Sequence, residues 1–119
     1  MKFELKRSML LLVTLFFVAA MSAQPTESPR RINIVEKRFG YEPSEITLKK
    51  GEPVILTLSS DDVTHGLAIE ELGIKAEVKK GQADEVALTP SETGTFVGKC
   101  SHFCGRGHGS MTLKVNVVE

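Results

Sequence analysis

The chain has 119 residues, no tryptophan, and 15 basic against 15 acidic residues, so its formal net charge is zero. A balanced charge without a basic stripe argues against a protein that binds nucleic acid through its phosphates. The length allows one domain with a modest core, and two cysteines permit at most one disulfide or one small thiolate site.

Residues 1–23 have the composition of a secretory signal peptide. Basic residues open the chain, and an apolar run follows from Met9 to Ala20. Ser22 and Ala23 then provide small residues suited to cleavage. The apolar run is shorter than the roughly 20 residues of a membrane-spanning helix. We therefore predict that residues 1–23 are removed, that the protein is periplasmic or secreted, and that it then has no membrane span. An uncleaved membrane anchor is the alternative.

The remainder predicts a flexible lead-in and one folded domain, residues 32–119. Residues 24–31 are polar and contain two prolines, which favours a lead-in without regular structure. After it, short apolar runs of period two are separated by turn residues such as "FGYEPSE" from Phe39, and no segment has a helical period. Seven or eight short strands predict an all-β fold, a sandwich or a small barrel. The expected strands begin at Ile32, Ile46, Val54, His65, Ile74, Glu85, Gly94 and Met111.

The stretch "CSHFCGRGHGSM" holds both cysteines, two of the three histidines and a methionine. Cys100, Cys104, His108 and Met111 follow the pattern C-x3-C-x3-H-x2-M, and the glycines among them allow a tight loop. Thiolate, imidazole and thioether groups form a soft donor set that suits copper better than calcium or magnesium. Zinc would accept the cysteines and the histidine, but it gives no reason for the methionine.

A histidine far away in the sequence is the remaining candidate ligand. His65 lies in "DDVTHGLAI", directly after the strand expected to begin at Val54. A β-sandwich can bring the end of that strand beside the loop before the last strand. Alone, His65 would be interpreted as a surface or turn histidine, but the C-terminal cluster favours a metal ligand. Asp61 and Asp62 are interpreted as solvated turn residues.

Together these motifs resemble the copper-binding domain of cytochrome c oxidase subunit II, the CuA-type cupredoxin. The resemblance rests on D-V-x-H at Asp62–His65, G-I-K at Gly73–Lys75, "TPSETGTFVGKC" and "CSHFCGRGHGSM". The third segment has one residue more between Pro90 and Gly94 than the family pattern. The similarity extends over Ile32–Glu119 and implies a cupredoxin-like Greek-key β-sandwich.

The resemblance also implies copper, with two ions per chain. The two thiolates would bridge both ions, each histidine would bind one ion, and a thioether and a carbonyl would be weak axial ligands. Bridging would spread one unpaired electron over both ions, so the geometry would change little on reduction. The implied ligands are His65, Cys100, the backbone carbonyl of His102, Cys104, His108 and Met111.

Three features depart from the family pattern. Residue 102 is a histidine where the family usually has an acidic residue, which keeps the carbonyl and adds an imidazole. The chain has no tryptophan, although the family usually receives its electron through a surface tryptophan. The family's paired transmembrane helices are missing as well. We therefore predict a free-standing relative rather than a structural subunit of an oxidase.

The predicted function is that of an electron carrier, not an enzyme. Its redox partner would be a c-type cytochrome or an oxidase, and a thiol reductant would prepare the cysteines for metal. A copper carrier that supplies an oxidase, or a mononuclear type 1 copper protein, would use the same residues. A thiol–disulfide enzyme would be expected to alternate strands with helices, and a structural disulfide would leave His65, His108 and Met111 unexplained.

Overall fold

The computed structural model describes residues 28–119, so the predicted signal peptide and residues 24–27 of the predicted lead-in lie outside the described part of the chain. This part contains nine strands and two short 3-10 helices. Within it, no helix is long and apolar enough to cross a bilayer. The elements are β1 (Arg30–Lys37), β2 (Gly40–Glu42), β3 (Glu45–Lys49), β4 (Val54–Ser60), β5 (His65–Ile69), η1 (Glu70–Leu72), β6 (Ile74–Val78), β7 (Ala83–Leu88), β8 (Gly94–Lys99), η2 (His108–Ser110) and β9 (Thr112–Val118).

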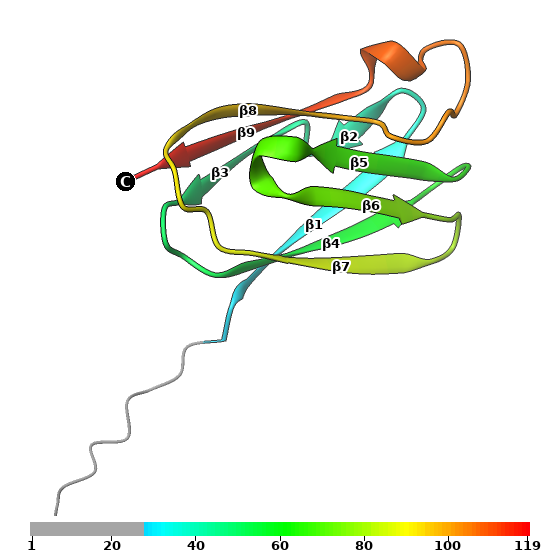
Figure 1. The fold of residues 1–119 in the computed structure, drawn as a ribbon. Coiled ribbons are helices and arrows are strands. Elements are labelled where there is room, and N and C mark those ends of the chain that lie inside the picture. The colour runs from blue at the N-terminus through cyan, green and yellow to red at the C-terminus, as the bar shows by residue number, and fades with distance from the viewer. Residues whose placement is uncertain (1–27) are drawn as a thin grey trace, which may run out of the picture.

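The strands form two sheets that pack as a sandwich (Figure 1). One sheet has the order β2-β1-β4-β7 and the other β3-β9-β8-β5-β6. Strands β1 and β4 run parallel, as do β3 and β9, and the other neighbours are antiparallel. Figure 1 shows the loop between β8 and β9 at the same end as the β1–β2 connection and the start of β5. The predicted β-sandwich is thereby confirmed.

The number and the limits of the strands differ from the prediction. Strand β2 lies inside the segment expected to be a turn, because Tyr41 is buried there and pairs with Glu36 of β1. Strand β1 begins at Arg30, inside the predicted lead-in, because Arg30 pairs with Val54 of β4. Its side chain also donates to Glu52 at 3.0 Å. The limits of both strands are set by their pairing with neighbouring strands. A hydrophobic pattern confined to one segment cannot reveal such pairing.

The core fills the space between the sheets, as the alternating pattern predicts. In β4, Val54, Leu56 and Leu58 are buried, while the residues between them are half-buried. In β9, Leu113, Val115 and Val117 are buried in the same way. The two cysteines and Met111 belong to this same cluster of buried side chains. The two thiols and the thioether among the candidate metal ligands are therefore part of the hydrophobic core, away from bulk water.

Candidate metal centre

The loop between β8 and β9 and the first residue of β5 bring three buried side chains together. Cys100 and Cys104 are buried free cysteines, with their Sγ atoms 3.8 Å apart. His65 is fully buried, and each of the three residues offers one ligand atom within 4.8 Å of the other two. The distant histidine, predicted to approach the loop, is thus next to both thiols.

One ring nitrogen of His65 supports a metal at this place. His65 Nδ1 is buried and has no hydrogen-bond partner, whereas His65 Nε2 lies 2.5 Å from Asp62 Oδ1. A buried polar atom without a partner is costly, and the nitrogen opposite a carboxylate contact is the one that a metal usually takes. The soft thiols beside it complete a donor set that suits copper. The residues present therefore fit the metal that the resemblance implies.

Asp62 fixes the orientation of the His65 ring. Its carboxylate accepts hydrogen bonds from the Arg38 N–H at 2.8 Å and the Val63 N–H at 2.7 Å, besides the contact with His65. Partial desolvation opposes ionisation, but these hydrogen bonds outweigh it and lower the pKa of Asp62 to about 2. Asp62 is therefore a charged positioning residue, not the solvated turn residue that its sequence neighbours suggest.

The remaining predicted ligands surround the two thiols. His108 Nδ1 and Met111 Sδ each lie 3.9 Å from Cys104 Sγ. The Cys100 thiol donates to the backbone carbonyl of His102 at 3.0 Å. All six predicted residues thus lie at one end of the sandwich.

The protonation of the Cys104 thiol responds to burial. Burial, followed by the hydrogen bond and charge of Cys100, raises the pKa of Cys104 to about 11. Without a metal, the Cys104 thiol therefore holds its proton at neutral pH. Since metals bind thiolates, metal binding has to release this proton.

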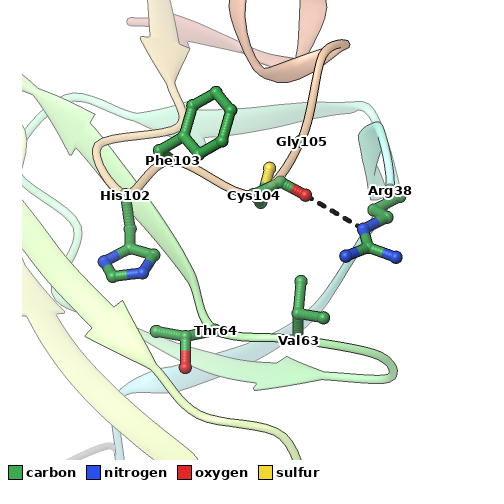
Figure 2. A pocket seen from close by; sticks show the side chains of 7 residues that line it. All are labelled: Arg38, Val63, Thr64, His102, Phe103, Cys104 and Gly105. Carbon is green, nitrogen blue, oxygen red and sulfur yellow. Dashed lines mark hydrogen bonds between the residues drawn. The ribbon is translucent and has the colours of Figure 1, made fainter.

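The side chain of His102 points away from the thiols. Its ring is 43% exposed and Nδ1 lies 3.5 Å from Glu77 Oε1 of β6. It borders an open cavity of about 390 Å³, where the Arg38 Nε–H donates to the Cys104 carbonyl at 2.9 Å (Figure 2). The cavity is lined by Arg38, Val63, Thr64, His102, Phe103, Cys104 and Gly105. The imidazole that replaces the family's acidic residue is thus a surface group.

Close approach of the loop to β5 depends on Gly66. A Cβ atom at this position would overlap Ser101 Oγ and would lie 3.2 Å from both His102 N and Ala76 O. The loop that carries the thiols therefore passes directly over the backbone beside His65. The hydroxyl of Tyr41 donates to the Gly66 carbonyl at 2.6 Å and holds the same backbone from the core side.

Gly66→Ala should destabilise the fold and weaken metal binding, because the added methyl pushes the loop away from His65. We expect the free energy of unfolding to fall by about 1–3 kcal/mol, the usual cost of overpacking. Urea denaturation of the metal-free protein and copper titration measure the two effects. Gly109→Ala is the matched control, since nothing lies within 4 Å of a Cβ there. Equal stability and copper content in the two variants would contradict this role of Gly66.

Sequence reasoning missed three residues that support the site. Asp62, Arg38 and Tyr41 act through hydrogen bonds to His65, to the Cys104 carbonyl and to the Gly66 carbonyl. The D-V-x-H spacing carried a signal for Asp62, because it puts a carboxylate three residues before a ligand. No local sequence pattern indicates the hydrogen-bond partners of Arg38 and Tyr41, which lie 66 and 25 residues away.

Comparison with known sequences gives a family. The family model for the periplasmic domain of cytochrome c oxidase subunit II matches residues 18–118. Cytochrome c oxidase subunit 2 of Thermus thermophilus is 34% identical over 81 residues, which cover 68% of this chain and 60% of that relative. The chain therefore spans less than two-thirds of that relative's length.

Comparison with solved structures gives the same fold. The periplasmic domain of subunit II of cytochrome oxidase from Bradyrhizobium japonicum matches with a TM-score of 0.71 at 20% identity, over 81% of this chain and 88% of that one. Subunit II of cytochrome c oxidase in a mixed disulfide with a thioredoxin-like protein matches with a TM-score of 0.66 at 18% identity, over 83% and 88%.

The family and the fold agree with the site. The family consists of periplasmic domains, which confirms the predicted location, and the solved structures confirm the cupredoxin-like sandwich. The buried His65, Cys100 and Cys104 are consistent with copper, the metal that the family implies. The chain belongs to the family of cytochrome c oxidase subunit II periplasmic domains, the CuA-type cupredoxins.

Proposed function

We propose that this domain carries single electrons in the periplasm through a copper centre with two ions. The observation that carries the proposal is the buried, unpartnered Nδ1 of His65 beside two free thiols. A mononuclear blue copper site needs only one cysteine, so the second thiol favours a site with two bridged ions. Bound copper would supply one-electron redox chemistry.

Each predicted ligand would have its own role in holding the copper. Cys100 and Cys104 would bridge the ions as thiolates, and His65 and His108 would each hold one ion through Nδ1. The Met111 thioether and the His102 carbonyl would act as weak axial ligands. The Asp62 carboxylate would keep the His65 ring in the tautomer that leaves Nδ1 free for metal, since Nε2 faces Asp62.

Two kinds of partner follow from the site. A c-type cytochrome or an oxidase would exchange the electron, and the family of oxidase subunits favours such a partner. A thiol reductant would act before the metal binds, because two thiols 3.8 Å apart can oxidise to a disulfide. The related subunit II captured in a mixed disulfide with a thioredoxin-like protein supports a reductant of that class.

Copper reconstitution with metal counting and electron paramagnetic resonance tests the proposal. We expect two copper ions per chain and a spectrum in which one unpaired electron is shared by two equivalent nuclei. One ion per chain with a single-copper spectrum would instead support a type 1 site. Rapid loss of copper to a mild chelator would favour the copper carrier over the electron carrier.

Met111→Leu should keep the copper and raise the reduction potential, because the axial thioether is a weak ligand and leucine makes the site more apolar. Spectroelectrochemical titration measures the potential. Leu113→Met, two residues further along the buried face, is the control for packing, since exchanges between Leu and Met conserve volume. Complete loss of copper in Met111→Leu would show that the thioether is a principal ligand.

A further inference from the structure

Glu36 is an ionisable residue buried inside the sandwich, and the proposed copper centre does not explain its presence there. It lies on β1 with no exposed surface, and neither oxygen of its carboxyl group has a hydrogen-bond partner. Ile34, two residues earlier, faces the same core. A buried carboxylate without a partner destabilises a fold, so proteins rarely keep one without a use for it.

The strand pairing puts Glu36 at the end of the sandwich that holds the metal centre. Glu36 pairs with Tyr41 of β2 on one side and with Ser60 of β4 on the other. The Tyr41 hydroxyl donates to the carbonyl of Gly66, the residue after His65. Burial is the largest cause that raises the pKa of Tyr41, and the next causes are the charges of Cys100, Glu36 and Cys104. Glu36 and the two thiols therefore all influence the pKa of the same tyrosine.

Neither strand that pairs with β1 places a cation opposite Glu36. From β2, Tyr41 pairs with Glu36, and its hydroxyl donates to the Gly66 carbonyl. From β4 it meets Ser60, whose hydroxyl donates to the Val63 carbonyl. In the turn after β4, the Asp61 N–H donates to the backbone carbonyl of Glu36 at 3.0 Å, and the Asp62 carboxylate is engaged by Arg38, Val63 and His65. Within the described part of the chain neither oxygen of the Glu36 carboxyl group has a partner, and burial is the cause that raises its pKa.

We propose that Glu36 is the proton-binding residue of the copper centre, so that the domain carries a proton together with its electron. The inference rests on the proposed electron-transfer function. Bound copper would supply one-electron redox chemistry, and on arrival of an electron from a one-electron donor protein the Glu36 carboxylate would gain one proton from water, with an O–H bond formed. When the electron leaves for the acceptor, that bond breaks and the proton returns to water.

The physical reason is that Glu36 is buried at the same end of the sandwich as a centre whose charge would change by one on reduction. Desolvation by burial raises the pKa of Glu36 from 4.5 to about 7, so small changes in its surroundings decide whether it holds a proton at neutral pH. Oxidation makes the centre more positive by one charge, which favours the carboxylate. Reduction removes that charge, which favours the neutral acid. Electron and proton are therefore linked through one buried group.

The test is the midpoint potential of the copper-loaded protein as a function of pH, in wild type and in Glu36→Gln. Full coupling changes the equilibrium constant for reduction tenfold per pH unit, or about 59 mV for one electron, with the potential falling as the pH rises. Glu36→Gln imitates the protonated acid. The two proteins should therefore converge at low pH and diverge at high pH, where wild type has the lower potential.

A matched control separates this role from general effects of charge. Glu42→Gln removes a carboxylate from the exposed side of neighbouring β2 and should keep the wild-type slope. A constant offset between wild type and Glu36→Gln at every pH would mean that Glu36 only shapes the site, and would overturn the proposal. Loss of copper in Glu36→Gln would also overturn it, because Glu36 would then be required for holding the metal.

Metal-free protein gives a readout that does not depend on copper. Between pH 4.5 and about 7 the folded state should hold the Glu36 proton that the unfolded state has lost. The free energy of unfolding should therefore fall as the pH rises through this window in wild type, but less in Glu36→Gln. If that difference is present and no copper binds, the proposed function has failed. If copper binds and the difference is absent, Glu36 does not titrate and the inference has failed.

Discussion

Cys100→Ser should reduce the copper content from two ions per chain to one and change the colour from purple towards blue or red. Without Cys100, the remaining donors are His65, Cys104, His108 and Met111, which is the ligand set of a type 1 copper site. Metal counting and visible spectroscopy measure the change. The expected effect is large because, in the proposed centre, a bridging sulfur would belong to both ions.

Cys104→Ser is the matched comparison for this prediction. Cys104 Sγ lies 3.9 Å from both His108 Nδ1 and Met111 Sδ, so its loss removes the sulfur that these two groups share. We therefore expect weaker copper binding in Cys104→Ser than in Cys100→Ser. If wild type binds one copper ion and Cys100→Ser keeps the same spectrum, the two sulfurs do not bridge.

Air-oxidised, metal-free protein should take up almost no copper, and a thiol reductant should restore uptake. The sulfurs of Cys100 and Cys104 lie 3.8 Å apart, and a disulfide needs about 2.05 Å, so a small local movement can join them. A disulfide cannot supply the thiolates that copper binds. Titration of free thiols alongside copper binding, before and after reduction, tests this.

Cys100→Ser also serves as the control for the redox prediction. It has no second cysteine, so oxidation cannot form a disulfide within the chain, and brief exposure to air should leave its copper uptake unchanged. Circular dichroism should show the same fold in oxidised and reduced wild type, because the change is confined to the loop. Full copper loading of a wild-type sample with no titratable thiols would refute the claim that both cysteines bind the metal.

The fold was predictable to the level of the β-sandwich but not to its strand limits. Period-two alternation in β4 and β9 identified the buried faces, since adjacent side chains of a strand point to opposite sides. Strand β2 has only three residues and lies in an apparent turn, so its pairing with β1 was invisible in the sequence. Strand β2 forms because Tyr41 is buried in the core and pairs with Glu36 of β1.

The amino-acid sequence by itself determined which donor atoms are available, because Cys100, Cys104, His108 and Met111 lie within one loop whose spacing is local. It also determined the family to which the motifs belong. Only the tertiary structure decided which nitrogen of His65 is free for metal, because that depends on the contact between its other nitrogen and Asp62. The burial of Glu36 beside Tyr41 was likewise decided by sheet pairing. The sequence has an acidic residue at an inward-facing position of β1, where an apolar residue is expected. The residues around it come from strands that only folding brings together.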